Sequence, residues 1–252
     1  MSQTALIFGG SGKVARKLTS LLTSQSPPWT VYSVIRSSSQ VSTLEFLGAK
    51  PIVQSIESST IADLADTIKA SSANVVIWAA GAGGGDPART LSVDRDGAIK
   101  SMDACVVAGV KRYIIVSAID VRDRENKAVP GWYDKHDSKT SEGGWGAIGD
   151  YMRAKFAADK ELRTGNGRRG LEYTIVRPGR LSDESGKGTV EAGKVHLGSQ
   201  ISREDVAAVL LACIKNDQTK GLAFDVVGGD LPVSDAVKRV ADNQEDCFEG
   251  FY

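Results

Sequence analysis

The stretch Thr4-Ala5-Leu6-Ile7-Phe8-Gly9-Gly10-Ser11-Gly12-Lys13-Val14-Ala15 decides the fold of this chain. Residues 5–8 form an apolar run that is too short for a helix and is typical of a buried parallel strand. A glycine cluster follows, and apolar residues then recur at helical spacing, at Val14, Leu18, Leu21 and Leu22. The stretch therefore predicts a strand, a tight glycine turn and a helix, in that order.

The glycines of this turn are typical of a dinucleotide-binding loop. They fit two patterns, Gly10-x-Gly12-x-x-Ala15 and Gly9-x-x-Gly12-x-x-Ala15, and the physical reasoning is the same for both. Without side chains the backbone can approach a pyrophosphate, and the start of the next helix offers free N–H groups and a positive dipole end. Ala15 still allows close packing of the helix on the strand. A purely structural turn is the alternative interpretation.

Composition sets the broad class of the protein. The chain has 252 residues, 41% of them hydrophobic, which is enough for one large core. Lys plus Arg and Asp plus Glu both number 31, so the net charge is zero and no nucleic-acid partner is expected. The chain has three cysteines, Cys105, Cys213 and Cys247, which form no CxxC motif. Because an odd number cannot all pair in disulfides, a reducing, intracellular environment is favoured. With no leader-like or membrane-spanning stretch recognised, we expect a cytoplasmic protein without a membrane partner.

Strand and helix patterns alternate along the rest of the chain. Further strands are expected at 29–35, 49–53, 74–80, 113–117, 171–176 and 223–227. Helices are expected at 41–47, 91–107, 151–162 and 233–240, and after capping boxes at Thr60-Ile-Ala-Asp63 and Ser202-Arg-Glu-Asp205. This alternation predicts an α/β fold, a Rossmann-type doubly wound parallel sheet with a small C-terminal substrate-side region.

Two long segments do not follow this alternation. Residues 120–149 mix charges, glycine and aromatics without periodicity and are expected to be a loop, and residues 181–197 are expected to be irregular. Loops of this length within a domain are usually functional. We therefore interpret 1–252 as a single domain in which 120–149 and 180–202 form the substrate side or a lid.

Arg36 ends the second expected strand, where a nucleotide fold meets the adenosine ribose. An acidic residue there would bind the 2′-hydroxyl of NAD, whereas Arg accommodates the 2′-phosphate of NADP. Lys13 could add a second positive charge. The sequence therefore favours NADP over NAD, with an ordinary surface arginine as the alternative. The glycine run 81–85 follows the fourth strand, and it either covers the cofactor or is a simple turn.

Tyr151-Met-Arg-Ala-Lys155 places a phenol and an ammonium group one turn apart on one helix face. A neighbouring Lys⁺ stabilises the phenolate and lowers the tyrosine pKa, so the pair can pass a proton to or from a carbonyl or alcohol oxygen. Ser117 ends the fifth strand, where ligands bind in such sheets, and could orient that oxygen. The spacing also occurs by chance, in which case Tyr151 is simply half buried.

Five segments together resemble the short-chain dehydrogenase/reductase superfamily, and in particular its atypical NmrA-like and epimerase-like members. These segments are Phe8-Gly-Gly-Ser-Gly-Lys-Val-Ala15, Ala108-Gly-Val-Lys-Arg-Tyr-Ile-Ile-Val-Ser117, Tyr151-x-x-x-Lys155, Tyr173-Thr-Ile-Val-Arg-Pro-Gly179 and Ile201-Ser-Arg-Glu-Asp-Val-Ala207. They span nearly the whole chain in the order found in the family. The resemblance implies an NAD(P)-binding fold and a hydride-transfer site.

The resemblance also implies roles for individual residues. Gly9, Gly10, Ser11, Gly12, Lys13 and Val14 would form the phosphate loop, and Arg36 would meet the 2′-phosphate. Ala79, Ala80 and Gly81 would line the adenosine side. Ser55 and Ile56 stand where many relatives have an Asp near the adenine. Lys155 would hold the nicotinamide ribose, and Pro178 would lie near the nicotinamide.

These observations predict an NADP-dependent oxidoreductase of a small carbonyl or alcohol substrate, with Ser117, Tyr151 and Lys155 as its catalytic residues. Two alternatives remain open, a non-catalytic NADP(H) sensor and an NAD(P)-dependent epimerase or isomerase. His136 and His196 lack metal-ligand spacing, so no metal site is expected. The sequence does not distinguish a monomer from a homodimer.

Overall fold

The computed structural model describes residues 3–83 and 86–252. Its strands are β1 (Thr4–Phe8), β2 (Thr30–Ile35), β3 (Lys50–Val53), β4 (Val75–Trp78), β5 (Arg112–Val116), β6 (Glu172–Pro178), β7 (Arg180–Ser182), β8 (Thr189–Gly193), β9 (Gln200–Ser202), β10 (Ala223–Gly228) and β11 (Leu231–Pro232). Nine of them form one sheet in the order β11-β8-β10-β6-β5-β4-β1-β2-β3, while β7 and β9 pair separately. From β10 to β3 all neighbours are parallel, as the alternating sequence predicts.

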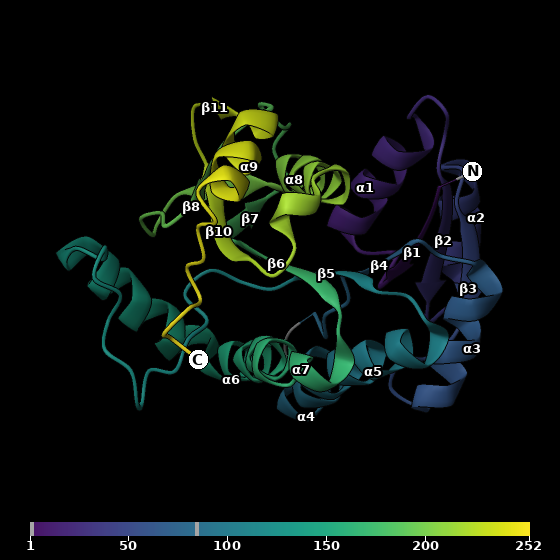
Figure 1. Cartoon of the computed structure of the whole chain (residues 1–252), viewed down its shortest axis with the longest axis horizontal. Helices are drawn as coiled ribbons and strands as arrows, with labels where there is room; N and C mark the ends of the chain where they lie inside the picture. Colours follow the sequence, from purple (N-terminus) through teal and green to yellow (C-terminus); the bar gives the residue numbers. More distant parts are fainter. Residues whose placement is uncertain (1–2, 84–85) are drawn as a thin grey trace.

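Helices cover both faces of the sheet (Figure 1). They are α1 (Lys13–Thr23), α2 (Val41–Phe46), α3 (Ile61–Ser71), α4 (Pro87–Thr90), α5 (Ala98–Ala108), α6 (Lys135–Thr164), α7 (Asn166–Arg169), α8 (Arg203–Lys215) and α9 (Val233–Asp242), with short turns η1 (Ser38–Gln40), η2 (Leu91–Gly97) and η3 (Asp217–Thr219). Helices α1, α8 and α9 pack on one face, and α3, α5 and α6 on the other. This is the expected doubly wound architecture. Among the described residues, no helix combines the length and apolarity needed to cross a membrane.

The prediction of a loop over 120–149 is wrong for the second half of this segment, because α6 already begins at Lys135. A capping box starts the helix: the Asp134 side chain accepts from the Asp137 N–H, and the Asp137 side chain accepts from the Asp134 N–H. The glycines at 143, 144 and 146 weaken the helical signal, and the backbone leaves helical geometry at Ile148, where α6 kinks. His136 therefore lies on a helix and not in a loop.

The expectation of an irregular segment at 181–197 is also wrong, because it contains β8. This strand pairs antiparallel with β10, and β11 pairs antiparallel with β8. Its five residues carry little signal of their own, since their pairing partner lies about thirty residues further along the chain. The parallel sheet is thus extended by two antiparallel strands at one edge.

The helix expected at 91–107 runs continuously from α4 through η2 into α5, and η2 is π-helical. Such wide turns commonly occur at functional sites because they redirect side chains. Val93, Asp94 and Gly97 of this segment are buried. The π-helical turn brings Asp94 to the interior beside α6, a placement on which the site depends.

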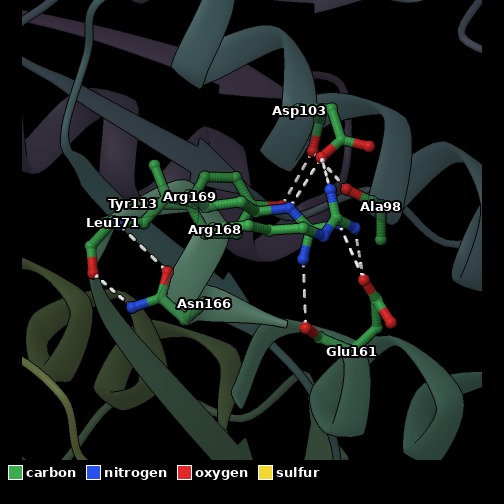
Figure 2. Close-up of polar contacts among 9 residues, drawn as sticks. Ala98, Asp103, Tyr113, Glu161, Asn166, Arg168, Arg169 and Leu171 are labelled. Carbon is green, nitrogen blue, oxygen red and sulfur yellow. Dashed lines mark hydrogen bonds and ion pairs between the residues drawn. The ribbon is translucent and has the colours of Figure 1, made fainter. Parts of the chain in front are cut away.

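A polar cluster holds the C-terminal part of α6 against α5 (Figure 2). The Arg169 side chain is 1% exposed and donates to Asp103 Oδ1 at 2.7 Å and to Glu161 Oε1 at 2.9 Å. Arg168 donates to the same two carboxylates from the outer side. The Asn166 side chain bonds the backbone of Leu171, so that α7 leads directly into β6. The cluster fixes the helix that carries Tyr151 and Lys155.

Candidate functional site

The glycine turn has the close backbone contacts that a phosphate loop requires. Gly9 has a φ of +76°, and a Cβ there would lie 2.5 Å from Ala80 Cα, so no other residue fits without displacing the backbone. A Cβ on Gly10 would meet the Ser33 side chain at 2.5 Å. Gly12 is the N-cap of α1, whose first turn carries no acidic residue and no side-chain cap. The N-terminus of α1 is thus left able to bind an anion.

A crevice of about 280 Å³ lies beside this turn, at the carboxyl ends of β1, β2 and β4. Ligands of open α/β sheets bind at this edge, where the strand order reverses. The crevice brings together eight residues expected from the sequence: Gly9, Ser11, Gly12, Arg36, Ile56, Ala79, Ala80 and Gly81. Gln40, Gln54, Glu57, Arg89 and Val93 line it as well and were not expected. Of the expected glycine loop, Gly83 also lines it, whereas Gly84 and Gly85 lie outside the described residues.

Four residues expected around the phosphates and the adenosine do not line this crevice. The Gly10 backbone donates to the Val34 carbonyl oxygen and packs against β2, and Val14 is on the buried face of α1. The Lys13 side chain pairs with Asp183 at 2.5 Å and lines a separate surface hollow. Ser55 is exposed. Arg36 is therefore the expected cation that reaches the crevice, and Arg89 beside it is paired with Glu57 at 3.1 Å.

A second cavity of about 520 Å³ lies at the carboxyl ends of β5 and β6. Ser117, Tyr151 and Pro178, three residues singled out from the sequence, line it together. The two long segments supply much of its remaining wall, through Asp120, Thr140, Ser141, Gly144 and Ile148 from one and Arg180, Leu181, Leu197, Gly198 and Ser199 from the other. Helix α6 thus closes the cavity with the half that the sequence did not predict.

Lys155 lies behind Tyr151 and is 3% exposed. Its ammonium group is 5.7 Å from the centre of the Tyr151 ring, 3.1 Å from Asp94 Oδ1 and 3.1 Å from the Val116 carbonyl oxygen. The other Asp94 oxygen accepts from the Ala82 N–H at 2.9 Å. Asp94 therefore joins the loop of the nucleotide crevice to the lysine beneath the second cavity.

Burial raises the pKa of Tyr151 above its usual value, although the Lys155 charge opposes this change. The net direction differs from the sequence expectation, which considered the lysine without the desolvation. Burial lowers the pKa of Lys155, but the facing Tyr151 and Asp94 outweigh it and raise that pKa overall. At neutral pH the site therefore holds a protonated phenol beside an ammonium ion, which suits proton donation.

Ser117 makes a contact that the sequence did not suggest. Its hydroxyl donates to Asp159 Oδ2 at 2.5 Å, and Asp159 is fully buried one turn beyond Lys155 on α6. Burial raises the pKa of Asp159 to about 6, while the Ser117 hydrogen bond, Arg177 and Lys155 act in the opposite direction. The spacing of Tyr151, Lys155 and Asp159, each four residues apart, was the available signal.

Asp134, Asp137 and His196 lie close enough for their side-chain oxygens and ring nitrogen to approach within 4.8 Å of one another. These atoms bond locally: His196 Nδ1 is 2.6 Å from Asp137 Oδ2, and Asp137 Oδ1 accepts from the Leu197 N–H at 2.6 Å. The group joins the start of α6 to the segment 194–199. These hydrogen bonds cap the start of α6 and anchor the loop, which explains why the three side chains lie together.

Comparison with known proteins identifies the family of the chain. The sequence pattern of the NAD(P)H-binding family matches residues 9–217. A UPF0659 protein of Schizosaccharomyces pombe is 38% identical over 235 residues, which cover 92% of each chain. YhfK of Bacillus subtilis, described as an uncharacterized sugar epimerase, is 35% identical over 235 residues, covering 93% of this chain and 98% of its own.

A solved structure of similar sequence shows the same fold. It is described as a putative NAD-dependent epimerase/dehydratase of Bacillus halodurans and superimposes with a TM-score of 0.77 at 29% identity, covering 94% of this chain and 100% of its own. The family pattern, the relatives and the fold all point the same way. The chain belongs to the NAD(P)H-binding family of Rossmann-type, oxidoreductase- and epimerase-like proteins, in agreement with its resemblance to the atypical short-chain dehydrogenase/reductases.

Proposed function

We propose that this protein is an NADP-dependent oxidoreductase that reduces a small carbonyl compound or oxidises the matching alcohol. One observation carries the proposal: Ser117 and Tyr151 line a single cavity, with the Lys155 ammonium group directly behind the phenol. A nicotinamide cofactor, when bound, would supply the hydride. Tyr151 then donates a proton to the substrate oxygen, and the Lys155 charge stabilises the phenolate that remains.

The residues fit such a cofactor in two places. The glycine turn and the open N-terminus of α1 would hold the pyrophosphate, and Arg36 at the end of β2 would bind the 2′-phosphate. Pro178 in the wall of the second cavity would lie near the nicotinamide. Lys155, expected at the nicotinamide ribose, lines neither cavity and faces the Tyr151 ring and Asp94 instead. Asp94, bonded to both Ala82 and Lys155, connects these two regions.

The lining of the second cavity favours a predominantly apolar substrate. Its wall includes six apolar side chains, those of Ile119, Ile148, Met152, Pro178, Leu181 and Leu197. A sugar carries a hydroxyl on nearly every carbon and requires a hydrogen-bond partner for each one that is buried. The named relatives nevertheless motivate a second candidate, an epimerase that oxidises and re-reduces its substrate.

The deciding measurement is NADPH consumption. The protein should be incubated with NADPH and a panel of aliphatic and aromatic ketones and aldehydes, and absorbance followed over time. Net oxidation of NADPH with formation of the alcohol supports the reductase. In a parallel incubation with NADP⁺ and a panel of sugars, interconversion of sugar stereoisomers without net formation of NADPH supports the epimerase. NADPH binding without turnover of either class favours a sensor.

Arg36 leads to a prediction about cofactor choice. Arg36→Ala removes the cation placed for the 2′-phosphate. Because a charge-assisted hydrogen bond is lost, NADPH affinity should fall about tenfold to hundredfold. NADH affinity should stay unchanged. Titration of both nucleotides by fluorescence measures the effect. Lys50→Ala is the matched control, because Lys50 is an exposed cation on β3, above the Tyr32 ring and away from the crevice. Equal wild-type affinity for the two nucleotides would contradict the NADP assignment.

A further inference from the structure

Asp159 has no part in the proton transfer described above, yet it bonds directly to Ser117, which lines the second cavity. It is fully buried, and its Oδ2 accepts from the Ser117 hydroxyl at 2.5 Å. Among the described residues, no hydrogen-bond donor reaches its Oδ1. Burying a carboxylate with one unpartnered oxygen costs folding free energy, so its presence calls for a functional explanation.

The bond to Asp159 restricts what Ser117 can do in the cavity. A serine hydroxyl has one hydrogen to donate and two lone pairs to accept with. While Asp159 is ionised, that hydrogen is committed to Oδ2, so Ser117 presents only lone pairs to a ligand. Once Asp159 carries a proton, its own O–H can donate to Ser117 Oγ, and the serine hydrogen is released towards the cavity.

We propose that the protonation of Asp159 decides whether Ser117 donates or accepts a hydrogen bond in the substrate cavity. Asp159 is then a positioning residue that acts through Ser117. With Asp159 protonated, Ser117 donates to a carbonyl oxygen, as reduction requires. With Asp159 ionised, Ser117 accepts from a hydroxyl group, as an alcohol substrate offers. The inference rests on the proposed function for its effect on substrates, but the link between the two side chains can be measured without it.

Burial and the neighbouring charges together set the pH at which Asp159 exchanges its proton. Burial raises its pKa to about 6, against the lowering effects of Ser117, Arg177 and Lys155. The other ionisable groups around it, from α6, η2, β5 and β10, are Tyr151, Asp94, Tyr113 and Asp225. The pKa values of Tyr151, Tyr113 and Lys155 all lie above their ordinary alkaline values. In the resting protein these groups therefore stay protonated over the pH range in which Asp159 titrates. Asp225, whose pKa burial raises to about 6, pairs with Arg177 and does not line the cavity.

The first test is a carbon-13 NMR titration of the aspartate carboxyl carbons in the cofactor-free protein. Ser117→Ala removes the hydrogen bond that stabilises the ionised Asp159, so the pKa of Asp159 should rise by about one to two units. Ser141→Ala is the matched control, since Ser141 is a buried serine of the same cavity that bonds Arg122 and not Asp159. It should leave the Asp159 titration in place. An Asp159 pKa that is the same with and without the Ser117 hydroxyl overturns the proposal.

The second test measures KM across pH for a carbonyl compound and its alcohol. In the wild type, the KM for the carbonyl compound should rise about tenfold between about pH 5 and about pH 8, and the KM for the alcohol should fall. A tenfold change matches the free energy of one hydrogen bond. Asp159→Asn cannot ionise and should remove both trends, although Asp225 still titrates. Trends that persist in Asp159→Asn overturn the proposal.

The two tests separate two possible failures. If Asp159 responds to Ser117→Ala but no carbonyl compound is reduced, the link between the side chains stands and the oxidoreductase assignment fails. If compounds are reduced but the carbonyl KM does not change with pH, the oxidoreductase assignment stands and the role of Asp159 fails.

Discussion

Tyr151→Phe should reduce the rate of carbonyl reduction by about 10²- to 10⁴-fold, the usual loss when a general acid is removed. Desolvation keeps the phenol protonated, and Lys155 behind the ring stabilises the phenolate formed when it donates. The phenol oxygen makes no hydrogen bond to another described residue, so stability and cofactor affinity should change little. Single-turnover kinetics with saturating NADPH measures the chemical step.

Tyr32→Phe serves as the control for that variant. Tyr32 lies on β2 beneath Lys50, remote from the second cavity, and loses the same single oxygen. Its rate should equal that of the wild type. If Tyr151→Phe reduces substrate as fast as Tyr32→Phe, the proton comes from another group, and the role assigned to Tyr151 is wrong.

Asp94→Ala should lower the free energy of unfolding by about 3–5 kcal/mol, because it leaves the Lys155 ammonium group buried without its counter-ion. Both side chains are inaccessible, at 0% and 3% exposure, and the Ala82 N–H also loses its acceptor. Urea unfolding measures the loss. Cofactor affinity should fall too, because the crevice loop is no longer tied to α6.

A control and a double variant distinguish the buried ion pair from a general effect of charge. Asp96→Ala breaks the exposed pair with Arg95 in the same π-helical segment and should cost less than about 1 kcal/mol. Asp94→Leu combined with Lys155→Met removes both charges and should recover much of the stability lost in Asp94→Ala. If Asp94→Ala costs no more than Asp96→Ala, the pair does not stabilise the fold.

Local sequence was sufficient for the first half of the fold. The apolar run 5–8, the glycine turn and the helical spacing after Val14 each depend on neighbouring residues alone, and all three are confirmed. Strand β8 and the first half of α6 were missed. The strand depends on a partner in β10, and the first half of the helix has four glycines and no apolar stripe, so neither has a strong local signal.

The candidate site was partly predictable for the same reason. Tyr151 and Lys155 share a helix face by spacing, and Ser117 lies at a strand end, so their placement beside the second cavity followed from the pattern. Asp94 and Asp159 look like surface charges in the sequence, because both stand in charged segments. Only the packing of η2 and α6 shows that both are buried. Desolvation, which sets the direction of the Tyr151 pKa, is likewise invisible in the sequence.

The edge strand β8 has a consequence for how the chain folds as it leaves the ribosome. In the described structure β8 pairs only with β10 and β11, both of which are synthesised later. The strands around the nucleotide crevice, β1 to β4, are complete by Trp78. N-terminal elements generally fold first during synthesis. We therefore expect the nascent protein to assemble its nucleotide half early, while the wall formed by 180–202 stays open until translation has passed residue 228.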